Sequence, residues 1–138
     1  MPKFKYIDAC IKETLRFQGP INAISRHCKK KTDVLAGKYA IDFDKIIYVN
    51  LPGLHHDPAV WGSDHDEYKP ERMLNFEKIP PGAWKPFGTG IRACIGRAFA
   101  EQEMLIIVAL ILQRFQVEMA DPSYNLSMIL SNSSLPLD

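Results

Sequence analysis

The chain has 138 residues, of which 46% are hydrophobic and 24% charged, and this balance predicts one ordinary globular domain with a hydrophobic core. Its formal net charge of +1 gives no reason to expect binding to nucleic acid or to anionic membranes. The three cysteines form no C-x-x-C pair, which argues against a disulfide scaffold and predicts a reducing, cytoplasmic location. We expect neither a secretory signal nor a membrane span, because the longest apolar run, residues 104–112, is too short for a bilayer.

A helical pattern begins the chain. Positions 4, 7, 11, 14 and 15 fall on one stripe, which predicts an amphipathic helix over residues 3–17, and Gly19-Pro20 should end it. β-rich pieces follow at residues 34–35, 39–41 and 46–49, separated by turn-forming residues. They predict a small antiparallel hairpin or ribbon.

A loop-rich stretch extends from about Trp61 to Cys94, where prolines and glycines interrupt every periodic pattern. We interpret it as a functional meander, or as a segment that packs against further protein, with a short helix around residues 66–74. The helix predicted over residues 96–116 is apolar on nearly every side, so we expect it to be buried on all sides. One more hairpin strand is expected around residues 126–130.

The segment at residues 87–100, FGTGIRACIGRAFA, carries the most informative chemistry. Its glycines allow the backbone to turn tightly and to approach a flat ligand. Cys94 stands at the start of the long predicted helix, where backbone N–H groups and the helix dipole favour a thiolate. A thiolate is a suitable axial ligand for haem iron, and its electron donation favours O–O cleavage. Arg92 could bind a haem propionate, and Phe87 could shield the sulfur from water.

Three other interpretations of these residues are possible. Residues 88–93 fit the dinucleotide fingerprint G-x-G-x-x-A, but that motif must follow a strand, and Pro86 argues against one. A glycine-rich turn with Cys94 as a small buried apolar residue is the purely structural reading. The histidines do not suggest a zinc site, because no ligand spacing with Cys10 or Cys28 fits one. His55 is expected to hydrogen-bond structure near the edge of the haem.

The same segment resembles the signature F-x-x-G-x-R-x-C-x-G-x-x-x-A of the cytochrome P450 superfamily. The match holds at every defined position, namely Phe87, Gly90, Arg92, Cys94, Gly96 and Ala100. Two further motifs of the family stand in the right order. Residues 13–16 match the E-x-x-R of its K helix, and residues 70–73 match its P-E-R-F motif except at Met73. Residues 54–58 and 61–62 resemble the segment between these motifs.

The resemblance implies a mainly α fold with small β ribbons. Residues 1–138 would form the C-terminal, proximal part of a haem-thiolate domain: the K helix, β hairpins, meander, cysteine-ligand loop and L helix. It implies haem b as the cofactor, with contacts from Cys94, Arg92, Phe87, Gly88, Ile95 and Gly96, and with Cys94 as the iron ligand. A buried network of Glu13, Arg16 and Arg72 would hold the meander against the first helix. Ile21, Ala23 and Ile24 would lie near an apolar substrate, or equally form ordinary core packing.

Within the superfamily, the chain resembles the self-sufficient bacterial and fungal fatty-acid hydroxylases, which are fused to a flavin reductase. This implies hydroxylation of an apolar, fatty-acid-like substrate with O2. Electrons would come from NADPH through a flavoprotein carrying FAD and FMN, a module outside this chain. The distal I helix of the family is also missing, so we expect the isolated chain to be inactive. The alternative is a truncated, non-catalytic product that binds haem weakly or not at all.

Overall fold

The computed structural model describes residues 4–29, 32–121, 123, 128–130 and 134–136. Its helices are α1 (Lys5–Gln18), α2 (Leu51–His55), α3 (Pro58–Trp61), the 3-10 helices η2 (Pro70–Lys78) and η3 (Gly90–Arg92), and α4 (Arg97–Arg114). Its strands are β1 (Ala23–His27), β2 (Thr32–Leu35), β3 (Tyr39–Asp42), β4 (Ile46–Asn50), β5 (Met128–Leu130) and β6 (Ser134–Pro136). This mainly helical fold with small β ribbons is the predicted class.

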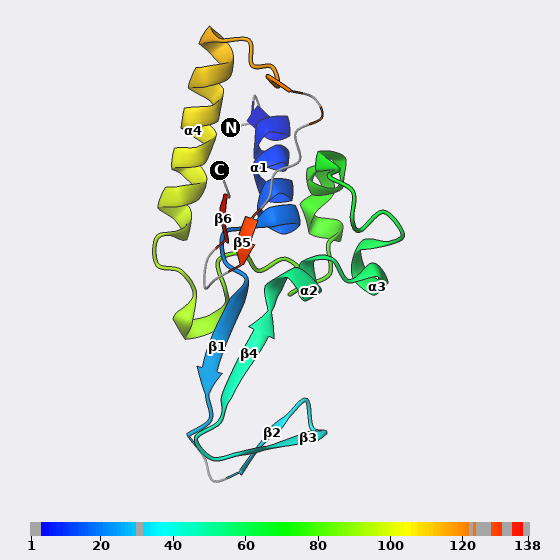
Figure 1. Cartoon of the computed structure of the whole chain (residues 1–138), viewed down its shortest axis with the longest axis vertical. Helices are drawn as coiled ribbons and strands as arrows, with labels where there is room; N and C mark the ends of the chain where they lie inside the picture. Colours follow the sequence, from blue (N-terminus) through cyan, green and yellow to red (C-terminus); the bar gives the residue numbers. More distant parts are fainter. Residues whose placement is uncertain (1–3, 30–31, 122, 124–127, 131–133, 137–138) are drawn as a thin grey trace.

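The strands form three separate two-stranded antiparallel ribbons, β1–β4, β2–β3 and β5–β6. In the first, Ala23 pairs with Asn50 and His27 with Ile46. The β1–β4 ribbon extends away from the helices, and β2–β3 lies at its far end (Figure 1). The sequence predicted a hairpin that includes residues 46–49, but these residues pair with β1, which was not expected to be a strand.

Local sequence explains where the helices begin and end. A Cβ at Gly19 would lie 2.7 Å from the Leu15 carbonyl oxygen, so α1 ends at a position that requires glycine. The side chain of Asn50 accepts a hydrogen bond from the Gly53 N–H at the start of α2, and that of Asp57 caps α3 in the same way. Both short helices lie where no helix was predicted. The short helix that was expected around residues 66–74 is η2, which begins later, at Pro70.

The core lies between α1, η2 and the loop that leads to Cys94. Its buried members are Ala9, Leu15, Trp61, Met73, Ala83 and Trp84. The Trp84 ring meets Phe76 edge-on at 5.2 Å between centroids, and it meets Phe87 at 6.4 Å. This packing fixes the route of the chain toward the cysteine loop.

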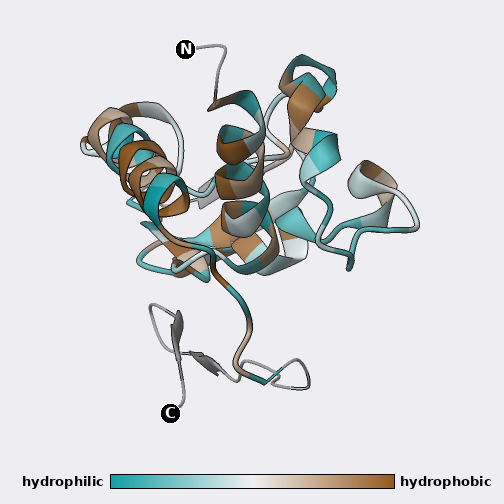
Figure 2. Cartoon of the chain, turned by 90° about the horizontal axis from the view of Figure 1, so that it is seen from above, coloured by the Kyte–Doolittle hydropathy of each residue, from teal (hydrophilic) through white to brown (hydrophobic). Residues whose placement is uncertain are grey.

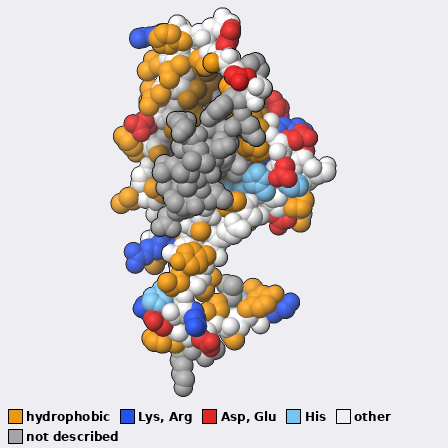
Figure 3. Space-filling model, in the orientation of Figure 1, with side chains coloured by type: hydrophobic (Ala, Val, Ile, Leu, Met, Phe, Trp, Pro, Cys, Tyr) orange, Lys and Arg blue, Asp and Glu red, His pale blue; other side chains and the backbone are white. Residues whose placement is uncertain are grey.

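Helix α4 is less buried than its sequence predicted. Among its described residues only Ala109 is buried, whereas Phe99, Ile106 and Leu112 are each more than half exposed. Figure 2 shows apolar residues around more than one side of this helix, and Figure 3 shows apolar side chains on its outer surface. No helix in the described part of the chain is long and apolar enough to cross a bilayer. Of the strand predicted over residues 126–130, the first two positions lie outside the described residues, and the rest is β5.

Candidate functional site

The cysteine loop, residues 86–96, folds back on itself just before α4. Gly88 and Gly90 adopt φ values of +72° and +69°, a left-handed conformation that favours glycine. The Cys94 N–H donates to the Phe87 carbonyl at 2.8 Å, and the Ala93 N–H donates to the Gly90 carbonyl at 3.0 Å. The residues before Gly88 form turns and irregular loop. The strand that a dinucleotide fingerprint requires is therefore absent from residues 81–87.

Cys94 lies just before the N-terminal end of α4, and its side chain is exposed. Within the described residues its thiol has no hydrogen-bonding partner. A Cβ at Gly96 would lie 3.9 Å from the Sγ atom, so the glycine leaves the sulfur uncovered on that side. Because the sulfur precedes an 18-residue helix, the N-terminal end of the helix dipole favours negative charge there.

A cavity of about 390 Å³ opens beside this sulfur. That volume lies within the range of small-molecule sites. Its walls come from the end of α1, from β1 and from the cysteine loop: Leu15, Pro20, Ile21, Ile24, Pro86, Phe87, Gly88, Arg92 and Cys94. The structure thus brings Ile21 and Ile24 to the same cavity as Cys94 and Arg92. Of the other expected contacts, Ala23, Ile95 and Gly96 do not line it, and Ile95 is fully exposed.

Arg92 reaches this cavity from η3. Its guanidinium makes no hydrogen bond or ion pair with any residue that the structure describes, so its donors remain open to a ligand. The exposed Cys94 thiol and mostly apolar side chains line the same cavity as this guanidinium. A soft sulfur donor, an unpaired guanidinium and apolar walls fit haem, which needs an axial ligand, partners for its propionates and a dry surface. The residues present therefore match the group that the family uses.

Phe87 forms the base of this arrangement. It is half-buried and packs against the core next to Trp84. The Arg97 guanidinium lies over both rings, with Cζ 5.6 Å from the Trp84 centroid and 5.8 Å from that of Phe87. Arg97 also pairs with Glu101 at 2.9 Å. Sequence reasoning missed Arg97, although an arginine three residues after the cysteine on the first turn of the helix could have suggested it.

Glu13, Arg16 and Arg72 meet in a charge network behind the core, and the first two are buried, at 0% and 1% exposure. Arg16 donates to both carboxylate oxygens of Glu13, at 2.9 Å each. Arg72 donates to Glu13 Oε1 at 3.0 Å. The same oxygen accepts from the Lys69 N–H at 2.9 Å. The carboxylate is therefore fully paired, which is what burial of charge requires.

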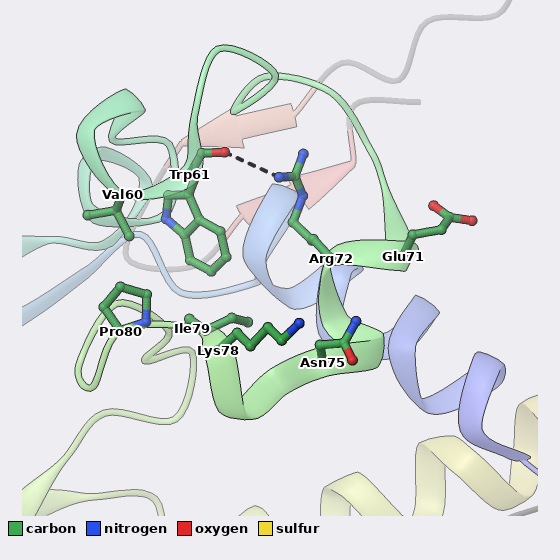
Figure 4. A pocket seen from close by; sticks show the side chains of 8 residues that line it. All are labelled: Val60, Trp61, Glu71, Arg72, Asn75, Lys78, Ile79 and Pro80. Atoms are coloured by element: carbon green, nitrogen blue, oxygen red, sulfur yellow. Dashed lines mark hydrogen bonds between the residues drawn. The ribbon is translucent and has the colours of Figure 1, made fainter.

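The two arginines also hold the meander by its carbonyl groups. Arg16 donates to the carbonyls of His55, His65 and Glu67 at 2.7, 2.8 and 3.0 Å. Arg72 donates to the carbonyl of Asp64 at 2.8 Å and to that of Trp61 at 3.3 Å. Figure 4 shows the second of these bonds, with Arg72 beside the Trp61 ring at the edge of a cavity of about 260 Å³. The network joins α1 to the loop between α3 and η2.

Asp64 and His55 extend this network. No role was predicted for Asp64 from the sequence, and His55 was expected only to hydrogen-bond structure near the edge of the haem. Hydrogen bonds from Lys69 and Arg72 lower the pKa of Asp64 to about 2, so it stays ionised. Burial, together with the nearby Arg16 charge, lowers the pKa of His55 to about 4, so its ring is neutral. Its Nε2 then accepts from the Lys85 N–H at 3.0 Å. His55 thus connects the Arg16 network to the segment that enters the cysteine loop.

Comparison with known proteins agrees with this geometry. The family model for cytochrome P450 matches residues 1–135. The bifunctional cytochrome P450/NADPH–P450 reductase ascE of Acremonium egyptiacum is 47% identical over 135 residues, which cover 93% of this chain and 13% of that protein. The self-sufficient cytochrome P450 monooxygenase CYP505E3 of Aspergillus terreus is 49% identical over 126 residues, 90% of this chain and 12% of that protein.

A bifunctional cytochrome P450/NADPH–P450 reductase of Aspergillus oryzae is 45% identical over 136 residues, which cover 93% of this chain and 12% of the relative. The chain therefore spans about an eighth of the length of the relatives that it matches. The match includes the cysteine loop, α1 and the meander, which are the parts that build the site described above. The chain belongs to the cytochrome P450 family.

Proposed function

We propose that this chain forms the proximal side of a haem b site in a monooxygenase domain, with the Cys94 thiolate as the iron ligand. One observation carries the proposal. The exposed Cys94 thiol and the unpaired Arg92 guanidinium share one apolar cavity. When bound, haem supplies the oxygen chemistry of monooxygenation, which needs O2 and two electrons. Family membership and the names of the relatives support this role.

The residues of the chain have separate tasks in this proposal. The glycine loop holds Cys94 at the cavity wall, at the N-terminal end of the α4 dipole, where it would bind the iron as a thiolate. Arg92 binds a propionate by a charge-assisted hydrogen bond. Phe87 excludes water from the sulfur, and the network around Glu13 keeps the loop in place through His55.

The proposed substrate is an apolar, fatty-acid-like molecule, and Ile21 and Ile24 are its proposed contacts. Both side chains line the cavity. The proposed electron donor is NADPH through FAD and FMN of a reductase module, because several relatives are named as fusions of a cytochrome P450 with an NADPH–P450 reductase. We further propose a cytoplasmic location, since all three cysteines are free thiols, as in reducing compartments.

A second candidate is a non-catalytic product that binds haem weakly or not at all. The exposed apolar side chains of α4 favour it for the 138-residue chain alone, because Phe99 and Ile106 are 71% and 57% exposed. A helix with these side chains is stable in water only when further protein covers it.

The decisive experiment is the reduced-CO difference spectrum, recorded on the whole protein that carries this chain and on the 138-residue chain alone. A thiolate-type Soret band in the whole protein is expected, and Cys94→Ala should abolish it. Cys10→Ala is the matched control, because Cys10 lies on α1 away from the cavity, and it should keep the band. A band in the first sample alone supports the second candidate for the isolated chain. A band that survives Cys94→Ala overturns the proposal.

The substrate contact has its own test. Titration of a fatty acid into the haem protein, followed by the shift of the Soret band, should show binding. Ile24→Glu places a charge in the apolar wall and should weaken binding at least about tenfold, because an unpaired buried charge costs several kcal/mol. Ala23→Glu is the neighbouring control, since Ala23 is exposed and does not line the cavity. Equal affinity in the two variants would remove Ile24 from the site.

A further inference from the structure

His56, His65 and Asp66 form a second cluster of metal-binding side chains, separate from the cavity beside Cys94. His56 follows α2, and the other two lie in the loop between α3 and η2. One ligand atom from each residue lies within 4.8 Å of the other two. Figure 3 shows histidine surface beside acidic side chains at this edge of the molecule. This cluster was not predicted from the sequence, because its members come from two separate loops and one of them is an aspartate.

The hydrogen bonds of His56 determine which ring nitrogen faces the cluster as a ligand. Its Nε2 lies 2.9 Å from the Phe17 carbonyl oxygen, and a carbonyl can only accept, so this nitrogen carries the hydrogen. In a neutral imidazole the other nitrogen, Nδ1, then bears a lone pair. It faces Asp66 Oδ1 at 2.8 Å. Two acceptors so close together need a cation, either a proton or a metal ion, between them.

His65 brings a third donor to the same point. Its Nδ1 lies 3.0 Å from Asp66 Oδ1. The atom is shielded from solvent and makes no hydrogen bond of standard geometry with the described residues. A buried polar atom without a hydrogen bond is costly in a folded protein. Coordination of a metal ion would satisfy it.

The backbone that carries these side chains is held from both sides. Arg16 donates to the carbonyl of His55, next to His56, and also to the carbonyl of His65. The bond from His56 to the Phe17 carbonyl fixes the orientation of the ring, as the outer-shell carbonyls of known metal sites do. Asp66 is 73% exposed, which leaves an open side for water. The cluster therefore has fixed nitrogen donors and one adaptable oxygen donor.

We propose that His56 Nδ1, His65 Nδ1 and Asp66 Oδ1 bind a divalent transition-metal ion of the zinc class, with water completing a tetrahedral site. Imidazole nitrogen suits zinc and its neighbours better than calcium or magnesium, which prefer oxygen ligands. Tetrahedral bonds of about 2.0–2.1 Å place the ligand atoms roughly 3.3 Å apart. The two distances from Asp66 Oδ1, 2.8 Å to His56 Nδ1 and 3.0 Å to His65 Nδ1, are close to that spacing. The ion would join the end of α2 to the loop that Arg16 already holds.

The test is a zinc titration of the haem-loaded protein that carries this chain, followed by calorimetry and by elemental analysis after dialysis. We expect one zinc per chain, with X-ray absorption showing nitrogen and oxygen neighbours and no sulfur. His65→Ala and Asp66→Asn should each weaken binding at least about tenfold, because even outer-shell changes cost 10–100-fold. His27→Ala is the matched control: His27 also pairs with an aspartate, Asp44, at 2.7 Å, but the described residues bring no third ligand to this pair.

Each outcome of this experiment decides the proposal. Loss of zinc in Asp66→Asn with retention in His27→Ala supports it. If His65→Ala does not fold, Asp66→Asn decides alone, since this exposed carboxylate has little part in packing. Absence of zinc binding in the micromolar range would show that a proton bridges His56 and Asp66, and it would overturn the proposal. So would zinc that is lost in Cys94→Ser and kept in Asp66→Asn. Neither outcome depends on monooxygenase activity.

Discussion

Arg72 Nε donates to Glu13 Oε1 at 3.0 Å, although 59 residues separate the two in the sequence. Glu13 is fully buried and Arg72 has 12% of its side chain exposed. The pair therefore fastens η2 to α1 with little competition from water. Breaking a buried pair leaves one charge without its partner, which costs far more than the pair itself contributes.

The first prediction follows from this pair. Glu13→Gln should lower the free energy of unfolding by about 3–5 kcal/mol, because it leaves two arginines short of their carboxylate. Urea unfolding measures this change, and the haem-to-protein absorbance ratio should fall with it. Lys69→Ala is the control: its ion pair with Asp64, at 2.7 Å, is on the surface and should contribute no more than about 1 kcal/mol. Equal stability of Glu13→Gln and the parent protein would contradict the assigned role.

The turn of the cysteine loop and the start of α4 could be predicted from the sequence because the local backbone restricts their residue types. Gly88 and Gly90 have positive φ, and Cys94 stands at a helix start, so each position admits few residues. The network around Glu13 was also predicted as a group, and the structure brings its members together. These motifs allow contacts between distant segments to be predicted without knowledge of the fold.

Other features could not be predicted because they depend on distant segments. β1 was missed, since it becomes a strand only by pairing with β4, and its residues are mostly exposed without an alternating pattern. The apolar stripe expected on α1 was wrong in part, because the helix buries the charged Glu13 and Arg16 beside Ala9 and Leu15. Paired charges can occupy positions that periodicity assigns to apolar residues.

A second prediction compares two glycines of the cysteine loop. Gly88→Ala and Gly90→Ala should each cost about 1–2 kcal/mol of stability, because both replace glycine at a positive φ. Only the first should also reduce the haem content. A Cβ at Gly88 enters the cavity and lies 3.4 Å from Ile24 Cδ1, whereas a Cβ at Gly90 has no neighbour within 4 Å among the described atoms. Chemical unfolding and haem content measure the two effects, and equal haem loss would attribute the effect to backbone strain alone.

The third prediction concerns pH. The folded chain holds the pKa of His55 at about 4, below the ordinary value of 6.5. The unfolded chain therefore binds a proton first as the pH falls, so His55 contributes stability above pH 6.5 and loses it between pH 6.5 and 4. The loss should reach roughly 3 kcal/mol, at about 1.4 kcal/mol per pH unit.

Unfolding curves recorded between pH 7 and pH 4 measure this loss. His55→Gln keeps a neutral acceptor near the Lys85 N–H but cannot be protonated, so its stability should change less over that range. An unchanged slope in His55→Gln would assign the acid sensitivity to other groups.

The fourth prediction concerns Arg92. Since its guanidinium has no partner within the described residues, Arg92→Gln should change the free energy of unfolding of the haem-free protein by less than about 0.5 kcal/mol. Haem affinity should nevertheless fall roughly 10–100-fold, because a hydrogen bond to a charged group contributes about 1.5–3 kcal/mol.

Arg114→Gln, at the other end of α4, removes a second exposed arginine and should leave haem affinity unchanged. The rate of haem transfer to an excess of an apoprotein acceptor measures the difference between the variants. Equal rates in the two variants would show that Arg92 holds no propionate, and a large loss of stability without haem would instead assign it a structural role in the cysteine loop.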